Sequence, residues 1–247
     1  MLKGALGIVD WGIGGLGVYR EVKARADIPV VYFSDQGFTP YGKTPGAVLG
    51  DRLDQIFRFL FAQGAAHVAI ACNAASAAHP GGERISRIIP FGAAMLKAGG
   101  WAHVGLIAGR ATVLSRVYRR EMAPFALDLK QRVAQPLSAH VEAGNLDGAD
   151  LHRDLRVILK PLYDCEAILL ACTHYPVIRQ QIARHVNPGC RLLDPAAAMA
   201  GWLVDHAGLG AACGEDRFFT SGDAAEFREH AKLAFEVEIE TVRKVVI

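Results

Sequence analysis

The stretch Val68–Ala77, which reads Val-Ala-Ile-Ala-Cys-Asn-Ala-Ala-Ser-Ala, decides the fold of this chain. It begins as an apolar run of strand length and then changes abruptly to Cys72, Asn73 and small residues of helical propensity. This pattern is typical of a buried parallel strand that ends where a helix begins. Ligands of open α/β sheets bind at the carboxyl ends of the strands. A thiol at this point also faces a helix N-terminus, so we expect the pKa of Cys72 to be lowered.

A second stretch repeats this construction, and its cysteine comes 100 residues after the first. The apolar run Ala167–Leu170 is followed by Ala171-Cys172-Thr173-His174-Tyr175-Pro176. Each of two predicted strand ends therefore presents a cysteine followed by an amide or hydroxyl residue. A single cysteine of this kind is more often a packed core thiol. Two cysteines in matching settings favour a functional pair.

Composition narrows the class of protein. The 247 residues are 51% hydrophobic and 21% charged, which predicts a globular chain with a sizeable core. A net charge of +2 without Lys/Arg blocks argues against a nucleic-acid partner, and no apolar run is long enough to predict a membrane partner. Five cysteines in no disulfide-framework spacing indicate free thiols and a cytoplasmic location. Without Cys-x-x-Cys or His-Glu-x-x-His, no metal site is expected.

Strand and helix patterns alternate along the chain, which predicts an α/β fold with mostly parallel sheets. Strand-like runs occur at residues 5–9, 30–33, 68–71, 85–90, 103–108, 167–170 and 192–193, and helical patterns at 18–26, 47–63, 113–122, 150–163, 176–185, 196–207 and 224–235. Residues 127–142 show no regular pattern. Because both cysteines follow third-strand-like positions, we predict two pseudo-symmetric lobes, residues 1–94 plus 206–247 and residues 95–205. Each lobe would be a mostly parallel sheet flanked by helices, with the active site in the cleft between them.

A glycine-rich turn offers a different interpretation. Gly12–Gly17 matches Gly-x-Gly-x-x-Gly between a predicted strand and a predicted helix, and Asp35 lies near the offset at which dinucleotide folds bind the ribose. Asp10 argues against this interpretation, because its carboxylate would face the pyrophosphate. The alternative is a tight turn that brings backbone close to whatever lies above it.

Two facing thiols suit proton exchange at a carbon next to a carboxylate. One group removes the proton from one face, and the other returns it to the opposite face. A thiol with a free pKa of about 8.5 can be tuned for either role. Asp10 could exchange protons with Cys72, and His174 with Cys172, while Glu142 is a third candidate on a predicted loop. Asp10 could instead be an N-cap, His174 a hydrogen-bonded residue at a helix start, and Glu142 a surface carboxylate.

These residues resemble those of the glutamate racemases, members of the aspartate/glutamate racemase superfamily that work without a cofactor. The similar segments follow family order and span the chain almost end to end. They are Ile8-Val9-Asp10 with the following glycines, Pro40-Tyr41-Gly42, Ala71-Cys72-Asn73 with Ala75-Ser76, Ala111-Thr112-Val113 with Ser115 and Tyr118, Val141-Glu142-Ala143-Gly144, Cys172-Thr173-His174-Tyr175-Pro176 and Thr220-Ser221-Gly222-Asp223. The Cys-Thr-His-Tyr-Pro run is the most specific of them.

The resemblance implies a cofactor-independent isomerase of amino acids. Cys72 would act on the D-enantiomer and Cys172 on the L-enantiomer, with Asp10, His174 and Glu142 as auxiliary groups. Substrate contacts would fall on Tyr41, Gly42, Asn73, Thr112 and Thr173. The resemblance further implies an amino-acid substrate, a homodimer and a role in supplying D-glutamate for peptidoglycan.

Three positions of the substrate-binding shell depart from the family. Trp11 stands where the family has a serine, and Ala74 and Gly109 stand where it has threonines. Loss of hydroxyls from a site that hydrogen-bonds its substrate can reduce discrimination by orders of magnitude. Interconversion of L- and D-glutamate by the two thiols is the reaction that the resemblance implies. The alternative is that the same thiol pair acts on a different amino acid or a related carbon acid, because Trp11, Ala74 and Gly109 replace family binding residues. A further alternative, motivated by Trp11, is a catalytically silent protein that binds a ligand.

Overall fold

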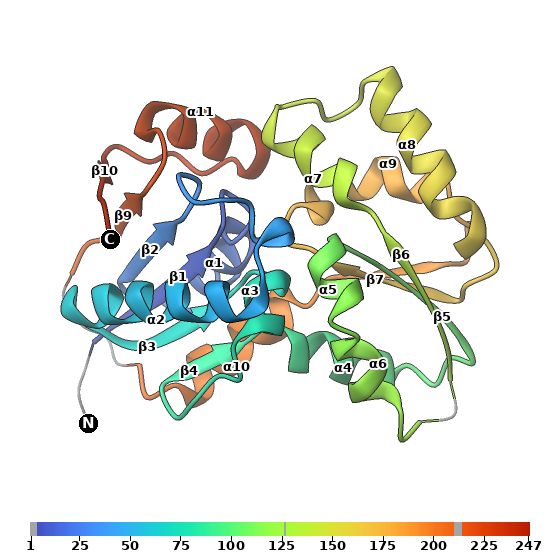
Figure 1. The fold of residues 1–247 in the computed structure, drawn as a ribbon, viewed down its shortest axis with the longest axis horizontal. Coiled ribbons are helices and arrows are strands. Elements are labelled where there is room, and N and C mark those ends of the chain that lie inside the picture. Colours follow the sequence, from blue (N-terminus) through green and yellow to red (C-terminus); the bar gives the residue numbers. More distant parts are fainter. Residues whose placement is uncertain (1–3, 126, 210–213) are drawn as a thin grey trace.

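The computed structural model describes residues 4–125, 127–209 and 214–247, so Cys213 lies outside the described residues. Figure 1 shows two halves side by side, each built on its own β-sheet, which we call the first and second lobes. Over these ranges, none of the helices combines the length and the apolar character that a membrane crossing requires.

Both sheets are parallel and repeat one strand order. The first sheet has the order β10-β9-β2-β1-β3-β4, and the second has the order β6-β5-β7-β8. The strands of the first sheet are β1 Ala5–Asp10, β2 Val30–Ser34, β3 Ala65–Ile70, β4 Ile85–Arg87, β9 Arg217–Thr220 and β10 Val242–Lys244; those of the second are β5 His103–Ala108, β6 Asp128–Val133, β7 Ala167–Ala171 and β8 Arg191–Leu193. In each lobe the order second-first-third-fourth recurs, which confirms the predicted α/β fold with two parallel sheets.

Helices accompany both sheets. In the first lobe they are α1 Leu16–Lys23, α2 Gly46–Ala62, α3 Asn73–Ala78, α10 Ala196–His206 and α11 Ala224–Phe235; in the second they are α4 Ile89–Ala98, α5 Arg110–Leu114, α6 Val117–Met122, α7 Gln135–Glu142, α8 Ala149–Leu159 and α9 Arg179–Ala183. The described part of the chain also contains the short 3₁₀ helices η1 Tyr41–Lys43, η2 Lys160–Leu162 and η3 Tyr175–Ile178.

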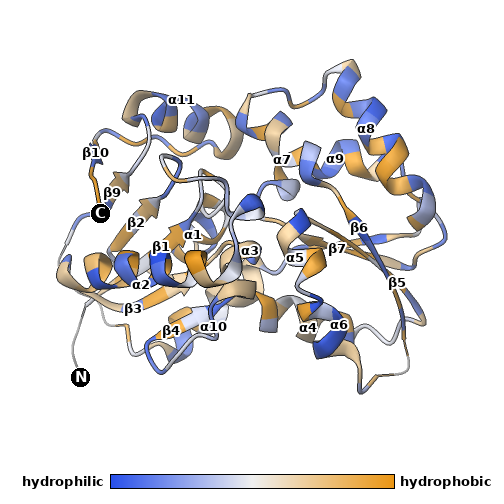
Figure 2. Ribbon diagram, viewed as in Figure 1, coloured by the Kyte–Doolittle hydropathy of each residue, from blue (hydrophilic) through white to orange (hydrophobic). Residues whose placement is uncertain are grey.

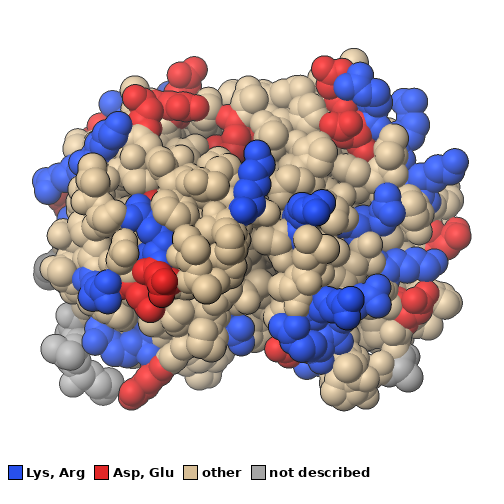
Figure 3. All heavy atoms as spheres, in the orientation of Figure 1, with Lys and Arg blue, Asp and Glu red and all other residues tan. Residues whose placement is uncertain are grey.

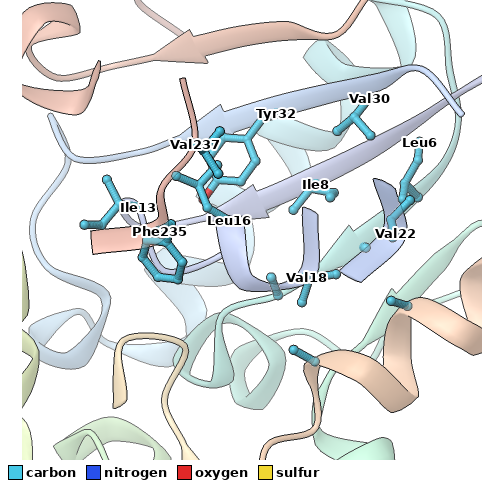
Figure 4. Packing of buried hydrophobic residues seen from close by; sticks show 14 of the residues in the cluster. Leu6, Ile8, Ile13, Leu16, Val18, Val22, Val30, Tyr32, Phe235 and Val237 are labelled. Atoms are coloured by element: carbon cyan, nitrogen blue, oxygen red, sulfur yellow. The ribbon is translucent and has the colours of Figure 1, made fainter. Parts of the chain in front are cut away.

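The central strands β1 and β7 are buried throughout, so both faces of each sheet are covered at its centre, since successive strand side chains point to opposite sides. Leu6 and Ile8 of β1 pack against α1, α10 and α11, whereas Val9 packs in the cluster that includes α2. Figure 4 shows Leu6 and Ile8 beside Val18 and Val22 of α1. Figure 2 shows mostly apolar strands at the centre of each sheet, such as β1 and β2, whereas the edge strand β6 is largely hydrophilic. The helices also carry hydrophilic residues, as expected for helices between a core and solvent.

Several segments differ from the sequence prediction. The strand predicted at 85–90 ends at Arg87, because Ile89 and Pro90 begin α4, and the helix predicted at 150–163 divides into α8 and η2. The helix predicted at 113–122 is two helices, α5 and α6, separated at Arg116, whose φ of 56° cannot continue a right-handed helix. The helix predicted at 176–185 divides into η3 and α9. Residues 127–142, predicted as irregular, form β6 and α7. Strand β6 lies at the edge of the sheet and is only partly buried, so it lacks a continuous apolar run.

The lobe boundaries stay a prediction, and one helix bears on them. The predicted boundary at residue 206 assigns α10 to the second lobe. Met199 and Leu203 of α10 nevertheless belong to the same apolar cluster as Val18 and Val22 of α1. Helix α10 therefore packs with the first lobe.

Candidate active site

One cavity, of about 70 Å³, lies between the two lobes and is lined by residues of both. Its lining residues are Asp10, Trp11, Pro40, Tyr41, Gly42, Cys72, Asn73 and Ala74 from the first lobe, and Gly109, Thr112, Gln135, Ser138, Ala171, Cys172, Thr173 and His174 from the second. All the site residues predicted from sequence line this cavity except Glu142, which lies directly behind His174. Because β1, β3 and β7 are parallel strands whose carboxyl ends meet here, residues far apart in sequence share one space.

Cys72 lies between the end of β3 and the start of α3. Burial raises the pKa of the Cys72 thiol well above its usual value, and the nearby Asp10 carboxylate raises it further. Backbone hydrogen bonds from Ala74 and Ala75 act in the opposite direction. The expectation that the helix N-terminus lowers the pKa of Cys72 is therefore wrong. Desolvation of a buried thiolate outweighs the few amides of a six-residue helix.

Cys172 has its own proton partner. The Sγ atom of Cys172 lies 3.6 Å from Nδ1 of His174, and Nε2 of His174 makes a short hydrogen bond to Oε1 of Glu142. Burial alone would lower the pKa of His174, but the Glu142 carboxylate and Cys172 raise it well above its usual value. Burial would likewise raise the pKa of Glu142, but His174 holds it below its usual value. His174 and Glu142 therefore form a buried ion pair.

Glu142 is not the loop or surface residue that the sequence suggested. It is the last residue of α7, and its side chain is 14% exposed. Helix α7 packs through Leu137 and Val141 on the second sheet, which directs Glu142 toward the other lobe. The position of Glu142 could not be derived from the sequence, because α7 is a regular helix in a segment whose apolar residues show no clear helical spacing.

Asp10 ends β1 with its carboxylate fully buried. It accepts hydrogen bonds from Oγ1 of Thr173 at 2.9 Å and from the amide of Gly12 at 3.3 Å. Burial raises the pKa of Asp10 to about 6, although His174 and these hydrogen bonds lower it. Asp10 does not cap α1, whose N-cap is Gly15. Its contact with Thr173 instead crosses between the lobes.

Side chains of the second lobe pack against the backbone of the glycine-rich turn. A side chain at Gly12 would collide with Glu142, and one at Gly14 would collide with Thr173 and His174. Asp35, the suggested ribose ligand, is buried and bound to Arg52 at 2.7 Å. The dinucleotide interpretation is therefore wrong, and the tight-turn interpretation holds. The glycines let the catalytic candidates of one lobe approach the backbone of the other.

The remaining predicted substrate contacts are held in place by neighbours. Tyr41 turns its hydroxyl to Asp35 at 2.9 Å, and Trp11 donates its indole N–H to the carbonyl of Phe38 at 3.0 Å. Asn73 is 3% exposed, and its Oδ1 accepts a hydrogen bond from Tyr118 at 2.8 Å. Within residues 4–125, 127–209 and 214–247, the Nδ2 group of Asn73 finds no hydrogen-bond partner. A buried donor of this kind needs an acceptor, and a ligand in the cavity would supply one.

Gln135 and Ser138 line the cavity but were not predicted. Oε1 of Gln135 accepts a hydrogen bond from the amide of Arg110 at 3.1 Å, and its Nε2 donates to Oγ of Ser138 at 3.2 Å. Both residues belong to the first turns of α7, in the segment predicted as irregular. The Gln-Pro pair at its start, with proline favoured in the first turn of a helix, was the available signal.

Comparison with known proteins assigns the family. Residues 41–202 match the protein family described as Asp/Glu/Hydantoin racemase. The chain belongs to this family. The resemblance stated from sequence and the class of enzyme, an isomerase of the racemase type, are thereby confirmed.

Relatives of this chain match it over nearly their whole length. A glutamate racemase from Desulforudis audaxviator is 33% identical over 276 aligned positions, covering 100% of this chain and 99% of that protein. The crystal structure of Thermus thermophilus glutamate racemase in complex with beta-chloro-D-alanine is 30% identical, with a TM-score of 0.86, and covers 98% of this chain and 97% of that chain. A Bacillus anthracis glutamate racemase isoform, at 24% identity, shares the fold with a TM-score of 0.90 over 100% of this chain and 99% of that chain.

Proposed function

We propose that this protein interconverts L- and D-glutamate without a cofactor, with Cys72 and Cys172 as its two acid/base groups. The observation that carries the proposal is that the two thiols line one cavity from opposite lobes, each beside a buried ionisable partner. The match to glutamate racemases over the full chain supports the reaction.

The environments of the two thiols suit opposite roles in one turnover. Burial keeps the proton on Cys72, so it is ready to donate. Sγ of Cys172 lies 3.6 Å from Nδ1 of the His174 imidazolium, which places a positive charge beside the group that accepts the α-proton. With an L-substrate, Cys172 would remove the α-proton and Cys72 would deliver its proton to the opposite face. In the reverse direction, Asp10 would accept the Cys72 proton, since its pKa of about 6 lies closer to neutrality than that of an ordinary carboxyl. Cys72 would then remove the α-proton, and the His174 imidazolium would supply the proton that Cys172 delivers to the opposite face.

The cavity also offers an anchor for the substrate. The free Nδ2 of Asn73 is a buried donor, and its direction is held by Tyr118. The hydroxyl of Thr112, itself buried, lies in the same lining. We assign these two groups to the α-carboxylate of the amino acid, because a carboxylate is the acceptor that such donors bind most strongly.

A second candidate keeps the mechanism and changes the substrate. Among the residues that the structure describes, no Lys or Arg lines the cavity, and the basic side chains that Figure 3 shows gathered near α6 lie outside the lining. Trp11, Ala74 and Gly109 all line it without offering a hydroxyl. Since the indole N–H of Trp11 is bound to Phe38, only its ring can contact a ligand. These features favour an amino acid with a less polar side chain than glutamate.

Deuterium uptake at Cα tests the proposal. Purified protein is incubated in heavy water with each enantiomer of glutamate and with a panel of other amino acids, and no cofactor is added. The α-proton signal is followed by NMR and racemisation by polarimetry. The wild type should exchange the α-proton, and Cys72→Ser and Cys172→Ser should each slow racemisation by about 10²- to 10⁴-fold.

Cys190→Ser is the matched control, because this thiol lies outside the cavity. If the two active-site variants racemise as fast as Cys190→Ser, the two-thiol mechanism is wrong. Thermal stabilisation by glutamate without exchange of any substrate would instead support the catalytically silent alternative. The homodimer, the cytoplasmic location and the supply of D-glutamate for peptidoglycan stay predictions from the family resemblance.

A further inference from the structure

We propose that Gln36 is a positioning residue for the second thiol, because it holds Glu142 against His174 and so keeps His174 directed at Cys172. This proposal rests on the two-thiol reaction proposed above. Nε2 of Gln36 donates a hydrogen bond to Oε2 of Glu142 at 2.8 Å. Gln36 follows β2 in the first lobe, whereas Glu142 ends α7 in the second. The proton relay behind Cys172 is therefore completed by a residue of the opposite lobe.

The backbone that presents Gln36 is firmly held. Its neighbour Asp35 is buried and donates its amide to the carbonyl of Asp10 at 3.1 Å. The Asp35 carboxylate accepts hydrogen bonds from Arg52 at 2.7 and 3.0 Å, from Tyr41 at 2.9 Å and from Ser221 at 2.8 Å. A side chain at Gly222 would come within 2.9 Å of Cβ of Gln36. This packing holds the backbone at Gln36, and Oε1 of its side chain accepts a hydrogen bond from Oγ of Ser34 at 3.5 Å. The amide nitrogen is thereby directed at Glu142.

Glu142 needs such a donor because its surroundings are not closed. One oxygen is bound to His174 and the other to Gln36, and the backbone of Ile13 also donates to this carboxylate. Gln36 is the side-chain donor from the opposite lobe. On its outer side lies a second cavity of about 570 Å³, whose lining includes Glu142, Trp11 and His230. Without Gln36, the Glu142 side chain gains the option of turning toward this outer cavity. The hydrogen bond from Gln36 makes the orientation toward His174 the favoured one.

The consequence reaches Cys172 through His174. The Glu142 carboxylate is the main cause of the raised pKa of His174, since burial acts in the opposite direction. A displaced carboxylate would leave His174 neutral more often. A neutral imidazole no longer places a positive charge 3.6 Å from Sγ of Cys172, and such a charge is what makes a neighbouring thiol reactive. The effect of Gln36 should therefore be specific to one of the two thiols.

Gln36→Met tests this, because it removes the amide donor and keeps the length of the side chain. Each thiol is alkylated with iodoacetamide at pH 7, and the rate at each cysteine is followed by peptide mass spectrometry. We expect alkylation of Cys172 to slow by about tenfold, the size expected for loss of a hydrogen bond to a charged group, while that of Cys72 stays the same. The value of kcat/KM should fall by a similar factor for both enantiomers.

The controls separate positioning from folding. Gln180→Met changes an exposed glutamine of α9 outside the active-site cavity and should match the wild type in every measurement. Gln36→Glu sets a second carboxylate against Glu142 and should slow Cys172 at least as much as Gln36→Met. Unchanged alkylation of Cys172, or equal slowing at both thiols, overturns the proposal. If the wild type racemises no amino acid, the proposed function fails, and the alkylation rates still decide the role of Gln36.

Discussion

Asp10 illustrates how single residues at this site acquire their properties. Its position at the end of β1 puts the carboxylate in the interior, where Thr173 and one amide are its hydrogen-bond donors. Two such bonds do not replace the water that a carboxylate loses, so its pKa rises to about 6. The pKa of the Cys72 thiol is raised for the same reason, whereas His174 and Glu142 keep each other ionised. All four groups are buried, and the partner of each group decides whether its pKa is raised or lowered.

Asp10→Asn should make the protein more stable at neutral pH. A carboxyl whose pKa is higher in the folded state contributes stability that is fully present below its unfolded value of 3.8 and is lost as the pH rises through about 6. Asparagine cannot ionise and keeps an acceptor for Thr173. Relative to the wild type, the variant should therefore gain up to about 3 kcal/mol in the free energy of unfolding between pH 4 and pH 8.

Urea unfolding of both proteins at pH 4 and pH 8 measures this difference. The gain should be small at pH 4 and large at pH 8, and it should accompany a loss of racemisation. A difference of the same size at both pH values would show that the carboxylate of Asp10 is not penalised by burial.

At the scale of elements, the pattern of burial decides which helices and strands can be predicted from the sequence. Helix α11 was predicted with the bounds it has, because its apolar residues follow a helical spacing onto one core. Strand β6 and helix α7 were missed, because an edge strand is half exposed and α7 offers only Leu137 and Val141 as buried positions. Helix α7 carries Gln135, Ser138 and Glu142. Because this segment was predicted as irregular, Gln135 and Ser138 were not predicted as site residues, and the position of Glu142 could not be derived.

Helix α8 provides a test of this dependence on burial. Leu155 is fully buried in the second lobe, whereas Val157, on the same helix, is 65% exposed. Leu155→Ala should lower the free energy of unfolding by about 2–5 kcal/mol, because it removes buried methyl groups and leaves a cavity. Val157→Ala should change it by less than about 0.5 kcal/mol. Urea titrations followed by circular dichroism compare the two, and equal effects would contradict the observed packing.

At the scale of the whole molecule, the site exists only where the two lobes meet. Each lobe supplies one thiol, and contacts that cross between them, Thr173 to Asp10 and Gln36 to Glu142, join their buried carboxylates. The glycine turn after β1 makes this approach possible, since side chains at Gly12 and Gly14 would occupy the space of Glu142 and Thr173. The reaction therefore requires the two lobes to fit together closely, although each lobe could fold without this fit.

Gly14→Ala should separate activity from folding. The added methyl group collides with Thr173 and His174 of the other lobe, so the thiols move apart while each sheet stays intact. We expect kcat/KM to fall by about 10²-fold, as displacement of catalytic groups by about 1 Å can do. Gly46→Ala is the control, because nothing lies within 4 Å of the new methyl group at the start of α2. Equal activity of the two variants, with unchanged circular dichroism, would argue against close fit of the lobes.

The sequence by itself determined the class of fold, the two cysteine-bearing strand ends and the family. These features are local: apolar runs of strand length, abrupt changes to small or polar residues, and a specific Cys-Thr-His-Tyr-Pro run. Parallel strands bring their carboxyl ends to one edge, so the residues that follow them could be assigned to a common site.

Only the tertiary structure decided how those residues behave. It filled the glycine turn with Glu142 and Thr173, joined Gln36 to Glu142 across the lobes and raised the pKa of Cys72 instead of lowering it. Each of these depends on what lies opposite a residue and on how much water is excluded. The spacing of residues along the chain predicts neither the opposing residue nor the exclusion of water, because the groups that meet come from segments more than a hundred residues apart.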